Sequence, residues 1–250
     1  MYKKQKDFIY LTLFFIFNIA IAQAMRLNET VSTVHCYVVL LVGLISAFRG
    51  NLAGVMYVCA YITGCEVLWR MTKADIFWES GKYAVMFLMA SKFLITGVKK
   101  PLLPLLYCLL LIPSTFTASI TFDTTQELRK QLSFNLSGPY ALAMSVLFFQ
   151  KIYITKEQLY KLFLMMMAPI AGIASLAIFS TYTTAHIGFR TGSNFVTSGG
   201  YGPNQVSAML GLAALLTFFY LVDNKKAPAK PLLFVVLPLR GLSAAKARSE

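Results

Sequence analysis

The stretch LFLMMMAPIAGIASLAIFSTY, Leu162–Tyr182, contains no charged residue. A helix of this length crosses the hydrocarbon core of a bilayer, which is roughly 30 Å thick. Similar apolar runs recur along the chain, and 57% of its 250 residues are hydrophobic against 13% charged. Because this composition lies far outside the range of soluble domains, the sequence predicts a polytopic membrane protein with an all-α fold.

We expect one integral membrane domain over residues 1–250, a helix bundle of about eight or nine spans. The predicted spans are residues 8–25, 34–48, 52–69, 83–98, 101–120, 137–150, 162–182 and 205–222, with a partial span at 231–239. Residues 240–250, RGLSAAKARSE, are polar and small, so we interpret them as an aberrant tail left by a truncation or a frame shift. Ala22-Gln23-Ala24 has the form of a signal-peptidase site. Since more spans follow at once, an uncleaved first span is the preferred interpretation.

The basic residues predict how the chain is oriented. The net charge is +13, but these residues sit in short loops between apolar runs. Topology and anionic lipid headgroups therefore explain them, and no nucleic-acid partner is expected. With the N-terminus in the cytoplasm, the inner loops hold the clusters Lys3–Lys6, Lys99–Lys100, Lys151–Lys161 and Lys225–Lys230 as well as Arg49, and the outer loops hold fewer basic residues. The positive-inside rule favours this orientation.

The clearest loop chemistry lies in RTGSNFVTSGGYGPNQVSAM, Arg190–Met209, which the topology places on the outer face. This stretch contains one arginine and no carboxylate. Its glycines Gly199, Gly200 and Gly202 permit backbone angles closed to other residues, so backbone N–H groups can face a ligand. Arg190 adds a planar fork that binds phosphate oxygens two at a time.

The end of this stretch predicts a helix start. Asn204 is expected to cap a helix that begins near Gln205, with Pro203 marking the boundary before it. A helix N-terminus presents unpaired N–H groups and a partial positive charge, which suit phosphate. The alternative is an ordinary turn between two membrane helices, and composition does not decide between the two.

Charged residues within or beside the spans give weaker signals. Glu66 and Arg70 are spaced to pair along one helix face, and a contact between Glu66 and Lys92 is a further option. A buried charge in a membrane usually faces a partner or a wet cavity, so the pair is either structural, which we prefer, or part of a polar track to a substrate. Arg129 and Lys130, in a predicted outer loop from Thr121 to Asn135, contact either a substrate diphosphate or lipid headgroups.

The remaining side chains suggest no separate chemistry. The sequence has no nucleophile–base constellation, zinc-spaced set or Walker-type loop, so we expect neither a metal nor a cofactor. His186 is interpreted as interfacial and His35 as a packing residue. The four cysteines all lie in apolar runs without a C-x-x-C pair, as is typical of small buried hydrophobes.

Several motifs together resemble a known family. They are EVLWRMTKADIFWESGKYAV (Glu66–Val85), ELRKQLSFNLSGPYALA (Glu127–Ala143), R-T-G-S (Arg190–Ser193) and G-P-N-Q (Gly202–Gln205). In this order, and with this topology, the chain resembles the O-antigen ligases and Wzy-type polysaccharide polymerases over most of residues 1–225. The resemblance implies a GT-C-like membrane glycosyltransferase, of which this chain is the N-terminal portion.

Such enzymes move a glycan from an undecaprenyl-diphosphate carrier to an acceptor at the outer face of the bacterial cytoplasmic membrane. They use no nucleotide sugar, and the acceptor is either lipid A core, for a ligase, or another glycan repeat, for a polymerase. The resemblance makes Arg190 a catalytic arginine and gives Gly202, Pro203 and Asn204 a role in shaping the substrate loop.

The family continues into further spans and an outer loop with a second arginine and, in ligases, a histidine. We therefore expect the chain as given not to catalyse alone. A lipid-glycan flippase and an envelope assembly subunit are the alternatives.

Overall fold

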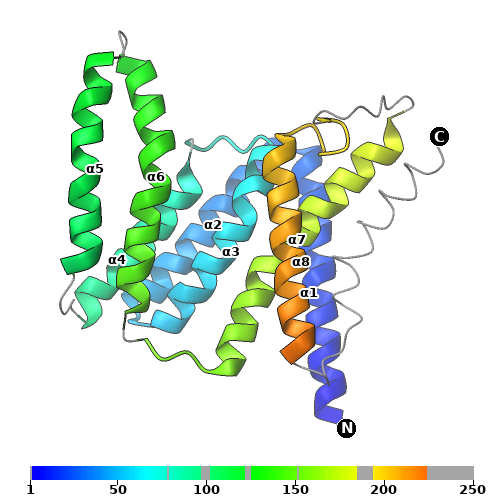
Figure 1. Ribbon diagram of the computed structural model, residues 1–250. Coiled ribbons are helices and arrows are strands. Elements are labelled where there is room, and N and C mark those ends of the chain that lie inside the picture. The colour runs from blue at the N-terminus through cyan, green and yellow to red at the C-terminus, as the bar shows by residue number, and fades with distance from the viewer. Residues whose placement is uncertain are drawn as a thin grey trace. The chain divides into compact units, whose positions relative to one another are not determined.

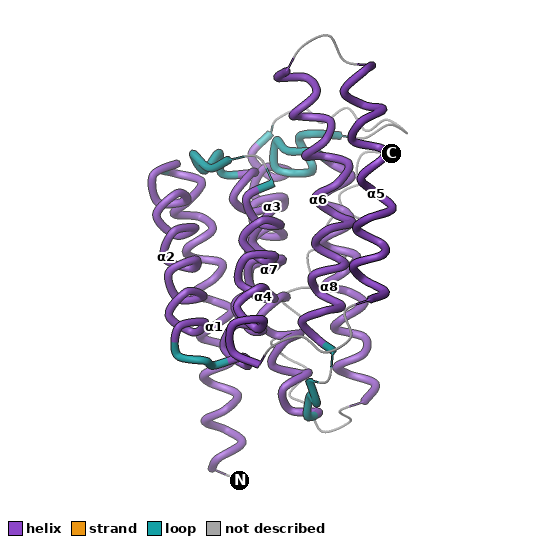
Figure 2. Tube along the Cα trace, turned by 90° about the vertical axis from the view of Figure 1, so that its left-hand side faces the viewer, coloured by secondary structure: helices purple, strands orange, loops and turns teal. Residues whose placement is uncertain are grey.

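The computed structural model describes residues 2–77, 79–96, 102–121, 125–150, 152–184 and 194–223 (Figure 1). Within these ranges every regular element is an α-helix, as the tube in Figure 2 shows. The helices are α1 (Tyr2–Leu27), α2 (Glu29–Phe48), α3 (Leu52–Met71), α4 (Ser80–Thr96), α5 (Leu102–Thr121), α6 (Thr125–Phe149), α7 (Lys156–Thr183) and α8 (Pro203–Asp223). Each of the eight complete predicted spans falls on one of these helices, which confirms the all-α prediction. The partial span 231–239 and the tail 240–250 lie outside the described residues.

Within the described ranges, five helices are long and apolar enough to cross a membrane. They are Ile9–Leu27 within α1, all of α2, α3 and α7, and Pro203–Val222 within α8. Five such helices indicate an integral membrane protein. In contrast, α4 has 17 residues and the apolar part of α6 is confined to Asn135–Phe149. Membrane crossing by α4, α5 and α6 stays a prediction, as do the identity of the membrane and the side on which the N-terminus lies.

The chain divides into two compact units. Unit 1 consists of Met1–Val38, Gly64–Asp75 and Lys156–Glu250, and unit 2 of Val39–Thr63 and Ile76–Thr155. The helices α2 and α3 each contribute one part to either unit.

Unit 1 is built on close packing of α7 against α1, α3 and α8. A methyl group added at Gly172 of α7 would lie 2.8 Å from Cβ of Ala22 in α1, and one added at Gly64 of α3 would lie 2.3 Å from the carbonyl oxygen of Met166 in α7. Small residues at helix contacts allow such approach, which is the main source of packing energy between membrane helices. The buried core residues shared by α1, α7 and α8 include Phe15, Met167, Ile170, Ala171, Ala213 and Tyr220.

The cysteines behave as the sequence predicts. Cys36, Cys59 and Cys65 are buried and Cys108 is half-buried, and none of the four forms a disulfide bond. The interpretation as small buried hydrophobic residues is therefore confirmed for the first three.

In unit 2, α6 packs against both α4 and α5. Leu88 and Met89 of α4 and Phe148 of α6 are buried, and Ser145 of α6 lies 3.5 Å from the Met89 sulfur. The chain enters α4 through Glu79, which has a φ of 68°.

The predicted loop from Thr121 to Asn135 is mostly helical, which corrects the expectation from sequence. Helix α6 begins at Thr125 and continues to Phe149, so Arg129 and Lys130 belong to its first turns. The residues Gln126–Leu132, five of them polar, are good helix formers. A polar helical extension beyond an apolar span has the same composition as a loop, and hydropathy does not separate the two.

Candidate functional site

The described part of the glycine-rich segment, Asn194–Gly202, forms a compact turn before α8. The N–H of Gly200 donates to the carbonyl of Phe195 at 2.7 Å, and the N–H of Gly199 donates to the carbonyl of Val196 at 3.1 Å. This pair of bonds is a Schellman motif, which ends a helical turn with a left-handed residue. Gly199 is that residue, with a φ of 73°, and Gly200 follows with a φ of 82°. Gly199 and Gly200 thus use the predicted backbone freedom and Gly202 does not, and the N–H groups of Gly199 and Gly200 donate within the turn instead of facing a ligand as expected.

Side chains close both ends of this turn. The Asn194 Oδ1 accepts a hydrogen bond from the Val196 N–H at 2.9 Å, as a residue does that caps a helix start. The Ser198 hydroxyl is buried and lies 2.5 Å from the carbonyl oxygen of Tyr201. Because these bonds are internal to the turn, its backbone is held in place before any ligand arrives.

Helix α8 begins at Pro203 and not near Gln205. The carbonyl of Gly202 accepts hydrogen bonds from the N–H groups of Gln205 at 3.0 Å and Val206 at 3.1 Å, so Gly202 is the N-cap. The prediction that Asn204 caps the helix was wrong. Proline suits the first helical position because its φ is already helical and it has no N–H to leave unpaired. Asn204 is exposed in the first turn of α8.

The turn packs against the ends of α3 and α7. A methyl group at Gly199 would lie 2.6 Å from the Met71 Cε and 3.6 Å from the backbone nitrogen of Ala177. Ala177 precedes the end of α7 at Thr183 by about 9 Å of helix. The turn therefore folds back alongside α7 before α8 begins.

Gly199→Ala is expected to destabilise unit 1, because an alanine in the left-handed region costs about 1–2 kcal/mol. Gly211→Ala is the matched control, since the backbone of Gly211 is not left-handed and no atom lies within 4 Å of an added methyl group. Thermal unfolding of the detergent-solubilised protein measures both. An equal fall in the unfolding midpoint for the two variants would contradict the role given to Gly199.

Polar contacts surround the end of α3 next to this turn. The Arg70 guanidinium donates to the Glu66 carboxylate at 2.5 Å, which confirms the predicted pair along one helix face. The indole N–H of the buried Trp69 donates to Nδ1 of His35 at 3.0 Å, in keeping with the packing role predicted for this histidine. The alternative contact of Glu66 with Lys92 is not tested, because the Lys92 side chain lies outside the described part.

Two further contacts hold the helix ends of unit 1 together. The hydroxyl groups of Ser32 in α2 and Thr72 after α3 lie 2.6 Å apart. The Arg26 guanidinium, at the end of α1, lies 3.7 Å from the centre of the Phe179 ring in α7, a cation–π geometry. The glycine-rich turn is thus carried by helix ends that are tied to one another.

The other predicted site residues are not described together with this turn. Arg190 and His186 lie outside the described residues. Arg129 and Lys130 lie in α6 of unit 2, and their side chains are also outside the described part. Gly202, Pro203 and Asn204 are the predicted site residues that the structure brings together, at the start of α8.

Sequence reasoning missed a buried charged cluster in unit 2. Glu79 is 1% exposed and forms an ion pair with Lys82, which lies in the first turn of α4. The Ser137 hydroxyl, from α6, donates to the Glu79 carboxylate at 3.3 Å and lies 3.4 Å from the Lys82 ammonium. The spacing of Glu79 and Lys82 was a visible signal for their pairing, whereas their burial against α6 was not.

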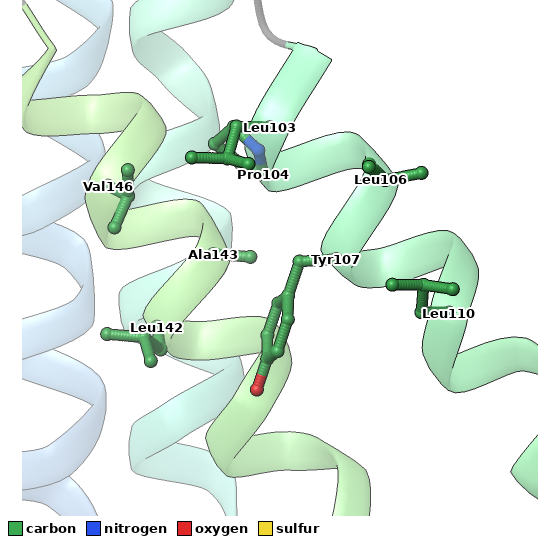
Figure 3. A pocket seen from close by; sticks show the side chains of 8 residues that line it. All are labelled: Leu103, Pro104, Leu106, Tyr107, Leu110, Leu142, Ala143 and Val146. Atoms are coloured by element: carbon green, nitrogen blue, oxygen red, sulfur yellow. The ribbon is translucent and has the colours of Figure 1, made fainter.

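An apolar groove lies between α5 and α6 (Figure 3), with a volume of about 380 Å³. Its lining is aliphatic apart from one tyrosine and consists of Leu103, Pro104, Leu106, Tyr107, Leu110, Leu142, Ala143 and Val146. The Tyr107 hydroxyl is the single polar side-chain atom in this set. The lining suits a hydrocarbon chain and supplies no acid, base or metal ligand.

Helices, hydropathy and turn together define the class: an all-helical integral membrane protein with a rigid glycine-capped turn at a helix start. Among the described residues, no three His, Cys, Asp or Glu side chains gather as metal ligands would. No family model, no curated protein and no solved structure matches the chain.

Proposed function

We propose that this chain contributes the carrier-binding part of a membrane glycosyltransferase, which moves a glycan from undecaprenyl diphosphate to a sugar acceptor. The observation that carries the proposal is the start of α8. The residues that resemble the family motif, Gly202, Pro203 and Asn204, form a helix N-terminus behind a turn whose backbone is fixed by internal hydrogen bonds. A helix N-terminus presents N–H groups and a partial positive charge, which suit the oxygens of a diphosphate.

In the proposed reaction an acceptor hydroxyl oxygen bonds to the anomeric carbon of the glycan and releases its proton to water. The bond between that carbon and the diphosphate oxygen breaks, and undecaprenyl diphosphate departs with the electron pair. Arg190 offsets the negative charge that develops on the leaving diphosphate, an electrostatic role. Arg129 and Lys130 add positive charge for the substrate headgroup. The acceptor, lipid A core or a second glycan repeat, distinguishes a ligase from a polymerase.

The distribution of basic residues supports an outer-face site in the cytoplasmic membrane. With the N-terminus inside, α7 ends and α8 begins on the outer side. A site there takes substrates that are already exported, and lipid-linked glycans are such substrates. The groove between α5 and α6 adds support, because its aliphatic lining suits the isoprenoid chain of a carrier.

Leu106→Trp is expected to obstruct this groove and weaken the apparent affinity for the carrier lipid about tenfold. A tenfold loss of affinity corresponds to no more than the free energy gained by burying one apolar side chain. Leu109→Trp is the matched control, since Leu109 is exposed on the same helix but does not line the groove. The dependence of transfer rate on carrier concentration measures both. Equal behaviour of the two variants would show that the carrier chain lies elsewhere.

The function is tested in membranes of cells that express the complete coding sequence and lack their own transferase. Supplied with radiolabelled lipid-linked glycan and an acceptor, these membranes are expected to release label from the lipid extract into glycosylated product. Label that stays on the carrier lipid with a functional acceptor present would contradict the proposal.

A further inference from the structure

We propose that unit 2 contains a saccharide-binding pocket between the start of α4 and the N-terminal half of α6. A cavity of about 690 Å³ lies there, within the size range of small-molecule sites. Phe77, Tyr83 and Tyr140 contribute aromatic rings, Ser133 contributes a hydroxyl group and Ser137 a buried one, and Met86 together with leucine side chains of α6 completes the lining.

The aromatic side chains provide a surface on which a sugar ring can pack. The rings of Phe77 and Tyr83 lie 5.3 Å apart between centroids and are tilted by 41°. Phe77 is 50% exposed and Tyr83 38% exposed, so both rings are accessible from the cavity. The face of an aromatic ring carries partial negative charge, which attracts the weakly positive C–H groups on the apolar face of a sugar.

Polar groups beside these rings match sugar hydroxyls. The Tyr83 hydroxyl lies 3.1 Å from the Ser133 hydroxyl. Ser137, also in the lining, is 2% exposed, and its hydroxyl is already bonded to the buried Glu79 carboxylate and the partly exposed Lys82 ammonium, so Tyr83 and Ser133 carry the hydroxyl groups that face a ligand. Hydroxyl groups act as both donors and acceptors, so this set accommodates a ligand whose own hydroxyls do the same.

The charges of the described side chains at the pocket favour a neutral ligand. A phosphate near Lys82 would meet the carboxylate of Glu79, which already neutralises that lysine. A hydrocarbon chain would bury the hydroxyl groups of Ser133 and Tyr83 without new partners, which is unfavourable for polar groups. A saccharide can pack its C–H groups on the rings and form hydrogen bonds with the hydroxyl groups.

The place of the pocket along α6 fits a water-soluble ligand. The apolar part of α6 is Asn135–Phe149, and the lining extends from Leu128 to Tyr140, so it straddles the boundary between polar and apolar helix. The binding of a saccharide is inferred from unit 2 alone. Only its further role as the acceptor glycan rests on the proposed transferase function.

Saturation-transfer NMR on the protein in lipid nanodiscs, free of sugar-based detergent, tests the pocket. The probes are maltose, lactose and N,N′-diacetylchitobiose, with sn-glycerol 3-phosphate as an anionic headgroup probe. At least one disaccharide is expected to give a signal that falls at least tenfold in Tyr83→Ala and about fivefold in Ser133→Ala, the loss of one hydrogen bond. Tyr153→Ala is the control, since Tyr153 is 95% exposed and outside the lining, and its signal is expected to equal that of the wild type.

Three results would overturn the inference for protein that elutes as a single symmetric peak: no disaccharide signal, a signal that Tyr83→Ala leaves unchanged, or a signal from glycerol phosphate alone. The assay contains no carrier lipid and no transfer step. Binding that persists while glycan transfer fails would therefore count against the transferase and not against the pocket.

Discussion

Arg190→Glu is expected to abolish glycan transfer. Removing one preorganised group that stabilises developing charge typically costs a factor of about 10²–10³ in rate, and a carboxylate in its place repels the diphosphate. Arg190→Lys is expected to retain part of the activity, because lysine keeps the charge but lacks the fork that binds two phosphate oxygens. The measurement is the yield of transferred glycan from the complete coding sequence, normalised to protein in the membrane.

Arg49→Glu is the control for this charge reversal. Arg49 is exposed after α2, in a loop that the predicted topology places on the cytoplasmic side, away from an outer-face reaction. Equal membrane levels of both variants separate a catalytic defect from failed insertion. Product formation by Arg190→Glu at the wild-type level would remove Arg190 from the mechanism.

Among glycine-to-alanine variants in unit 1, Gly64→Ala is expected to show the largest loss of stability. The added carbon would lie 2.3 Å from the carbonyl oxygen of Met166 and 2.6 Å from Cγ of Pro169. Both neighbours belong to rigid parts of α7, so the strain is relieved by moving α3 away from α7. Overpacking of this kind costs about 1–3 kcal/mol or more, and a fall in the thermal unfolding midpoint of the solubilised protein measures it.

Gly211→Ala controls for the glycine-to-alanine change itself. No atom lies within 4 Å of a methyl group added at Gly211 of α8, and alanine is favoured over glycine within a helix by up to about 1 kcal/mol. This variant is expected to match or exceed the wild-type midpoint. A midpoint for Gly64→Ala as high as that of Gly211→Ala would show that α3 and α7 do not approach as closely as described.

The helices were predictable because a membrane span is a local property of the sequence. Leu162–Tyr182 lacks charge over its whole length, and α7 forms there. Helix ends were less predictable. The polar residues before Asn135 extend α6 to Thr125. Hydropathy predicts which residues cross the bilayer, but it does not predict where the hydrogen bonds of the helix begin.

Some features of the candidate site were likewise predictable from the sequence and others were not. The left-handed backbone of Gly199 and Gly200 was predictable because it depends on the residue itself. Pro203 and Asn204 each carry a helix-start signal, and the hydrogen bonds to Gly202 decide in favour of Pro203. The contact of Ser137 with Glu79 joins residues 58 positions apart. No local pattern in a single sequence predicts such a contact.

The most direct test of the central claim uses the purified product of the complete coding sequence in proteoliposomes. Lipid-linked glycan with a labelled sugar is placed in the outer leaflet, and the acceptor is added outside, so that no translocation is needed. The account predicts that label leaves the carrier and appears on the acceptor with stoichiometric release of undecaprenyl diphosphate. Label that remains on the carrier, or that only moves to the inner leaflet as a flippase would move it, would contradict the account.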